Sequence, residues 1–180
     1  MKTKLLMLTV AMSCVFAGNA MALTKDEYKA QKTQISVDYK VNRDKCTALK
    51  ANAKDICVSE AKGTEKVAKA ELEAQYKPSS KNDQKVSIAK ADAAYSTAKQ
   101  KCDDLSGNSK DVCVKDAKAA HVKAKADAKV TKASVDTSKT KAETMTDVKK
   151  DANTEKREAD YSAAKAVSYT HLTLPTNREV

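Results

Sequence analysis

The feature that most constrains this chain is a pair of cysteines with ten residues between them, which occurs twice. Residues 39–62 align with residues 95–118 at an offset of 56, and eleven positions are identical. Shared Lys and Ala carry little weight in a chain this rich in both. Cysteines in register with Leu, Asn and Asp, however, indicate a duplicated structural unit. The non-Lys, non-Ala identities are Tyr39/Tyr95, Cys46/Cys102, Leu49/Leu105, Asn52/Asn108, Asp55/Asp111, Cys57/Cys113 and Val58/Val114.

Each unit has the pattern of a helical hairpin. In the second copy, residues at spacings of three and four form one helical stripe: Ile88, Ala91, Tyr95, Ala98, Cys102 and Leu105. Gly107 suits the left-handed residue that ends a helix, and Asn108 is the expected N-cap of the next helix, with Asp111 at N3. Because so short a loop makes the two helices antiparallel, Cys102 and Cys113 should lie at the same height.

The first copy has the same pattern with a different turn. Thr24 and Glu27 have the spacing of a capping box, which predicts the start of the first helix. Asn52 and Asp55 are expected to cap the second helix. Ala51 replaces the glycine, so we expect this turn to be less sharply defined. Two heptad positions carry the seam: Tyr28, Ile35, Asn42 and Leu49 on one, with Lys32, Tyr39 and Cys46 on the other.

Composition supports an all-α fold of elongated, antiparallel, coiled-coil-like hairpins. The chain has no Trp, one Phe, three Gly and 32% charged residues, which favours helices with narrow apolar seams over a large core. We expect hairpins over residues 23–77 and 84–130, joined by a linker at 78–83 in which Asn82 or Asp83 caps the third helix. Residues 131–166 are richer in Ser and Thr, which predicts a marginally stable charged helix.

The four cysteines of the duplicated unit predict two disulfides if the protein is exported. Four cysteines allow three connectivities. The hairpin geometry favours Cys46–Cys57 and Cys102–Cys113, each of which would stabilise the fold by about 3 kcal/mol on the chain-entropy model. A four-thiolate zinc site would need closely spaced cysteine pairs, and a thioredoxin-like redox pair would have two intervening residues. We therefore expect no metal and no cofactor.

The first 22 residues have the organisation of a signal peptide. Lys2 and Lys4 precede an apolar run that is short for a membrane span, and Ala20-Met21-Ala22 provides small residues at −3 and −1. Cleavage after Ala22 would deliver the chain to the periplasm. The alternative is an uncleaved N-terminal anchor. Cys14 lies within the apolar run, behind a poor lipobox, and is expected to leave with the signal.

The cysteine motifs resemble a known family. DKCTALKANAKDICVSEAKG (residues 44–63) and KCDDLSGNSKDVCVKDAKAAHVKAKADAK (residues 101–129) are similar to small uncharacterised Lys/Ala-rich periplasmic proteins of Gram-negative bacteria, sometimes labelled TolA-like. Members of that family carry K-C-D-x-L-x-G-N-A-K-D-x-C two or three times. The present chain departs from the pattern at Lys50-Ala51. The resemblance implies an exported helical protein and carries no established activity.

The C-terminal residues 167–180 differ from the rest of the chain. Composition changes abruptly at Val167, and residues 167–176 resemble the conceptual translation of a DNA-library adapter, so we expect a non-native tail. Just before it, residues 161–165 match residues 95–99 at Tyr, Ser, Ala and Lys. We therefore expect residues 131–166 to lead into a truncated third unit.

These patterns do not predict an enzyme. His121 lies among Ala and Lys, where we expect it to be solvated, and no phosphate loop, metal cluster or nucleophile motif is present. The leading hypothesis is a structural or interaction protein of the envelope periplasm that binds an envelope protein or forms a homo-oligomer. The net charge of +10 also allows weak binding to anionic surfaces, although interspersed acidic residues argue against specific nucleic-acid recognition. Residues 131–166 suggest a third possibility, a stress or desiccation protectant.

Overall fold

The computed structural model describes residues 23–137 and 142–172 and is all-α, as predicted. The expected signal peptide at 1–22 and residues 173–180 of the expected tail lie outside the described residues. One short 3₁₀ turn accompanies the α-helices. The elements are α1 (Lys25–Lys45), η1 (Cys46–Ala48), α2 (Ala51–Tyr76), α3 (Ser80–Cys102), α4 (Gly107–Thr137) and α5 (Ala142–Leu172).

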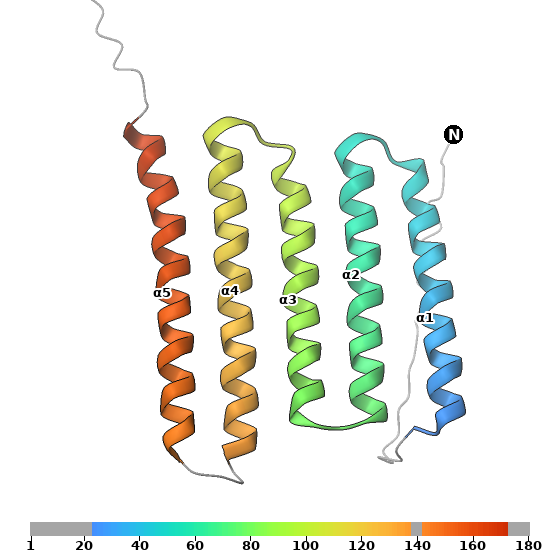
Figure 1. The fold of residues 1–180 in the computed structure, drawn as a ribbon. Helices are drawn as coiled ribbons and strands as arrows, with labels where there is room; N and C mark the ends of the chain where they lie inside the picture. The colour runs from blue at the N-terminus through green and yellow to red at the C-terminus, as the bar shows by residue number, and fades with distance from the viewer. Residues whose placement is uncertain (1–22, 138–141, 173–180) are drawn as a thin grey trace, which may run out of the picture.

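The α-helices stand side by side in chain order and run alternately up and down (Figure 1). Within the described residues, each helix packs only on its neighbours in the chain: α1 on α2, α2 on α3, α3 on α4 and α4 on α5. No helix lies across the row to cover it. The fold is therefore a single layer with two open faces, and α1 and α5 form its edges.

Narrow seams between the helices hold the layer together. Most of the buried residues are small, so neighbouring backbones can approach closely: Ala61, Ala91, Ala119, Ala126, Ala128, Ala152 and Ala166, with Leu72 the one large aliphatic side chain. One close approach is between α2 and α3. There a Cβ atom at Gly63 would lie 2.9 Å from the Cβ of Ala93, so a glycine is needed to keep this spacing.

The N-terminal ends of α1 and α3 are capped by side chains. At α1 the expected capping box is present: the Glu27 N–H donates to Thr24 Oγ1 at 3.3 Å, and the Thr24 N–H donates to Glu27 Oε2 at 2.8 Å. The Glu27 carboxylate accepts from the Thr24 N–H and also from the Thr24 hydroxyl at 2.7 Å, and these two hydrogen bonds lower the pKa of Glu27. At α3 the cap is Ser79, whose hydroxyl accepts from the Asn82 N–H at 3.2 Å.

The prediction of Asn82 or Asp83 as the cap of α3 was therefore wrong. The helix begins at Ser80, which shortens the linker predicted at 78–83. The Asn82 amide instead donates back to the Lys77 carbonyl at 2.7 Å and is buried in that role. Ser79 is in extended backbone, so its short hydroxyl reaches the free N–H of the first turn before Asn82 can act as a cap.

The hairpin turns also differ from the prediction. Lys50, not Asn52, is the N-cap of α2, and it makes no side-chain capping bond. Asn108 lies inside α4, which begins at Gly107. The reason is that the left-handed residue of each turn, Gly107 (φ 53°) or Ala51 (φ 49°), begins the second helix of the hairpin and does not end the first.

The C-terminal part is organised differently from the predicted domains. The second hairpin was expected to end at residue 130, but α4 continues to Thr137. The segment expected at 131–166 thus divides between the end of α4 and the greater part of α5, and α5 runs past the predicted boundary at residue 167. Ion pairs fasten α5 to α4, including Lys129–Glu155 at 2.6 Å.

Candidate functional site

Two disulfides staple the hairpins at one end of the layer. Cys46 pairs with Cys57 and Cys102 with Cys113, each with a Cα–Cα distance of 5.6 Å, the pairing that the hairpin geometry favours. Both turns lie at the upper end in Figure 1. The bonds are consistent with an oxidising, extracytoplasmic compartment. Within the described ranges, no helix has the length and apolar character to cross a membrane.

Asn52 joins the first hairpin to the second. Its side-chain amide donates to the backbone carbonyl of Gln100 near the C-terminal end of α3, at 2.8 Å. Below it, the buried Ser59 hydroxyl of α2 lies 3.0 Å from that of Ser96. Neither contact has a signal in the sequence, because both depend on which helices become neighbours.

The first hairpin is also fastened at the end opposite its disulfide. The rings of Tyr28 and Tyr76 stack with their centroids 4.5 Å apart. The Tyr28 hydroxyl donates to Glu73 Oε2 at 2.8 Å, and this bond to a carboxylate raises the pKa of Tyr28. The hairpin is thus held at both ends, which compensates for a seam with few large apolar side chains.

His121 is not solvated, contrary to the prediction. Its side chain is 17% exposed, and Nε2 lies 2.5 Å from Asp92 Oδ1. The imidazole stacks on Tyr95 with a centroid separation of 4.8 Å. Asp92 and Tyr95 are three residues apart on α3, so both reach α4 from the same side of the helix. This trio fills the α3–α4 seam with a polar and aromatic contact where an aliphatic one would be usual.

Helical periodicity separates the two open faces. On α3, Lys90, Ala94 and Lys101 share one face, while Asp92 and Lys99 are displaced from it by two residues or about 200°. Cross-helix pairs follow the same division. Lys90–Glu71 (2.8 Å) and Lys101–Glu60 (3.5 Å) bridge to α2 on the first face, which we call the groove face. The opposite side, which includes Asp92 and Lys99, is the basic face.

A shallow groove runs between α2 and α3 on the groove face. It encloses about 780 Å³. The Lys90–Glu71 and Lys101–Glu60 pairs cross it about three helical turns apart, so its α2 rim is acidic and its α3 rim is basic. Its floor consists of small or aliphatic residues: Gly63, Val67, Ala68, Ala93, Ala94 and Ala98. Within the described residues, this is an apolar strip that no other helix covers.

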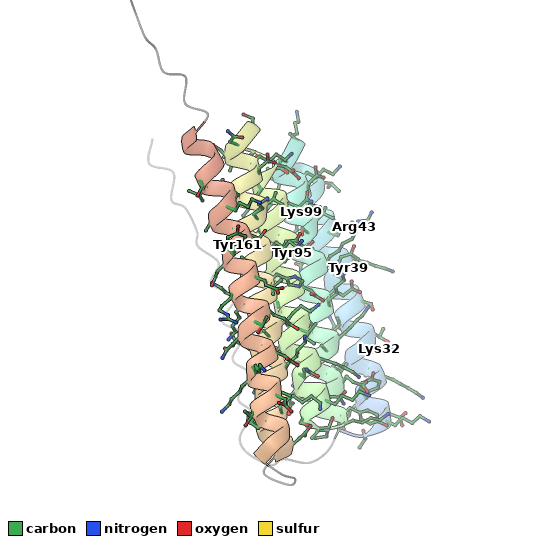
Figure 2. All side chains as sticks on the ribbon, turned by 60° about the vertical axis from the view of Figure 1, so that its left-hand side comes forward. Lys32, Tyr39, Arg43, Tyr95, Lys99 and Tyr161 are labelled. Atoms are coloured by element: carbon green, nitrogen blue, oxygen red, sulfur yellow. A yellow bond between two sulfur atoms is a disulfide. The ribbon has the colours of Figure 1, made fainter. Side chains whose placement is uncertain are left out.

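The basic face is dominated by cationic side chains on α1 to α4. On α1 they follow one continuous stripe at helical spacing: Lys25, Lys29, Lys32, Lys40 and Arg43, all exposed. By the same periodicity, Lys62, Lys66 and Lys69 on α2, Lys85 and Lys99 on α3, and Lys118, Lys125, Lys129 and Lys132 on α4 share this side. Figure 2 labels Lys32, Arg43 and Lys99 among the side chains that project from the layer.

Most of the carboxylates on the basic face already have partners. Glu73 accepts from Tyr28, Asp92 lies against His121, and Asp103 pairs with Lys110 at 2.9 Å. Asp136 pairs with Lys132 at 2.7 Å. The α1 stripe, in contrast, has one long ion pair, Lys29–Asp26 at 3.9 Å, among its described contacts. Among the described contacts, the cations of the α1 stripe therefore have few acidic partners.

Comparison with known proteins gives no match of this chain to any family model, curated protein or solved structure. In the part of the chain that the structure describes, no three His, Cys, Asp or Glu side chains lie close enough to hold a metal ion. The groove and the basic face are therefore the candidate sites.

Proposed function

We propose that this chain is a non-catalytic structural and interaction protein of the cell envelope, exported by the signal peptide at residues 1–22 and working in the periplasm. The single-layer fold carries this proposal. A layer whose helices pack only on chain neighbours leaves both faces available for contact with other molecules. The disulfides and the resemblance to Lys/Ala-rich periplasmic proteins support the compartment.

The partner that best fits the groove face is a second copy of the same chain. Small floor residues such as Ala94 allow a facing helix to approach closely, as helices do in packed interfaces. In a dimer with a two-fold axis parallel to the helices, α2 of one copy faces α3 of the other. The acidic α2 rim of each copy then meets the basic α3 rim of its partner, so the rims are self-complementary. Glu60 and Glu71 would lie opposite the partner copy's basic rim at the same height.

Self-association would also supply what the layer lacks. The buried residues within one chain are mostly alanines, so each seam contributes little apolar area. Covering the groove floor with a second copy would bury apolar surface without leaving a buried charge unpaired. The result is a two-layer helical assembly of the kind that a stable all-α protein usually forms within one chain.

The oligomeric state tests this proposal. We expect analytical ultracentrifugation of the exported chain to show a concentration-dependent dimer. Ala94→Glu places a carboxylate on the groove floor and should yield a monomer. Ala30→Glu, the same change at an exposed position on the outer edge of α1, should leave the dimer intact. A strict monomer at all concentrations, or equal effects of both variants, would refute self-association through the groove.

A further inference from the structure

The basic face has features that the groove does not explain. It lies on the opposite side of the layer from the groove, so a groove-mediated dimer leaves it uncovered on both copies. Its α1 stripe recurs at helical spacing with one gap, at Ser36, and the carboxylates on the same side of α2 are Asp55, Glu65 and Glu73. Glu65 is paired with Lys69 at 2.6 Å. Glu73 is engaged by the Tyr28 hydroxyl. A row of exposed cations of this length creates a positive potential that extends about a Debye length from the surface.

We propose that the basic face of α1 to α4 adsorbs to the anionic surface of a phospholipid bilayer. This inference rests on the proposed role as an interaction protein and names the partner of one face. The shape supports a bilayer over a rod-like polyanion, because the cations are spread across four adjacent helices (Figure 1) and are not gathered along one groove. Helices packed 8–10 Å apart make this a broad surface about 30 Å wide.

The residue types also fit phospholipid head groups. Lysine dominates the face, and its flexible stem carries a compact charge that follows mobile phosphates without fixed geometry. Arg43 is the one arginine on the described basic face, and arginine is the residue that nucleic-acid recognition favours. The exposed valines of α1, Val37 and Val41, lie on its outer edge, away from this face. Binding should therefore be electrostatic adsorption without insertion.

Vesicle co-sedimentation tests the inference. The probe is vesicles of equal parts phosphatidylglycerol and phosphatidylcholine, with pure phosphatidylcholine vesicles as the neutral comparison. We expect the chain to sediment with the anionic vesicles at low salt, to be released as salt rises, and to stay in solution with neutral vesicles. The triple variant Lys32→Glu, Lys40→Glu, Arg43→Glu should lose at least tenfold in apparent affinity.

A matched variant separates the face from the net charge. Three cations are exposed on α5: Lys149, Lys150 and Arg157. They line one hollow with Lys156 and Asp160. The ion pairs of Lys156 and Asp160 to α4 lie on the groove side, so these three cations are not on the basic face. Changing these three to Glu alters the net charge equally. We expect the apparent affinity of this variant for anionic vesicles to stay within about twofold of the unaltered chain. This is a much smaller loss than the tenfold loss expected of the basic-face variant. Circular dichroism checks that both variants are folded.

Three results of these binding measurements would overturn the proposal. Equal loss in both triple variants would show that net charge alone matters and would overturn the proposal. So would binding to neutral vesicles, or tighter binding to duplex DNA than to anionic vesicles at the same salt. Ala94→Glu, which blocks self-association, should still bind anionic vesicles. A failed dimer with intact lipid binding, or the reverse, therefore tells the two proposals apart.

Discussion

Gly63 of α2 and Ala93 of α3 mark a close approach of two neighbouring helices in the layer. A Cβ atom at position 63 would come within 2.9 Å of the Ala93 Cβ and 3.5 Å of its Cα. Both residues also line the groove. The spacing of this seam thus determines the packing of the two hairpins and the shape of the groove floor.

Gly63→Ala should destabilise the fold. Overpacking a close helix contact costs about 1–3 kcal/mol, and the better helix propensity of alanine returns up to about 1 kcal/mol. We expect a net loss of about 1–2 kcal/mol in the free energy of unfolding, measured by urea denaturation. Adding Ala93→Gly makes room for the new methyl group and should recover part of the loss. Additive effects of the two substitutions would show that they are not coupled through this contact.

The two hairpin turns predict opposite responses to exchanging Ala and Gly. Ala51 has φ 49° and Gly107 has φ 53°, and this left-handed region costs a residue with a Cβ about 1–2 kcal/mol. Because a glycine also adds entropy to the unfolded chain, Ala51→Gly should stabilise by about 1 kcal/mol and Gly107→Ala should destabilise by a similar amount. No atom lies within 4 Å of a Cβ built at Gly107, so the effect there comes from the backbone alone. Thermal unfolding of both variants measures it, and effects of the same sign would contradict the assigned turns.

The disulfides should contribute substantially to so thin a fold. Replacing Cys46 and Cys57 together by Ser opens the loop of the first hairpin and should cost about 3 kcal/mol on the chain-entropy model. The same change at Cys102 and Cys113 should cost a similar amount, because the sequence separation is 11 in both. Urea denaturation gives the magnitude, and peptide mapping without reductant gives the connectivity. A disulfide between the two hairpins would show that the pairing is wrong.

The sequence predicted the parts of this fold that depend on local spacing. Cysteine pairs with ten intervening residues across a short turn led to the correct hairpins, and Thr24 with Glu27 led to the correct start of α1. Contacts between units were not predictable in this way. Asn52 was expected to cap its own helix, yet it bonds the Gln100 carbonyl 48 residues away. His121 was expected in solvent, because its partners Asp92 and Tyr95 become visible only when α3 is known to be its neighbour.

The groove was likewise invisible in the sequence. Its floor residues, Gly63 and Val67 on α2 and Ala93 and Ala94 on α3, are ordinary in a helix of this composition. They become a continuous strip only because no third helix covers the α2–α3 seam in the described residues. The basic stripe of α1 has a regular spacing, but Lys32 was wrongly expected on the seam and is instead exposed on this face. The exposure of these side chains could not be predicted, since the same spacing would fit a helix whose basic side packs on an acidic neighbouring helix.

Charge reversal at the groove rims gives a direct test of the two-fold dimer. A chain with Glu60→Lys and Glu71→Lys has two basic rims, and a chain with Lys90→Glu and Lys101→Glu has two acidic rims. Each should be monomeric alone, because like charges then face one another across the axis. Mixed in equal amounts, the two chains should form a heterodimer, since each basic rim meets an acidic one. Sedimentation velocity on the separate and mixed samples measures this. Monomers in the mixture, or dimers of either chain alone, would place the interface elsewhere.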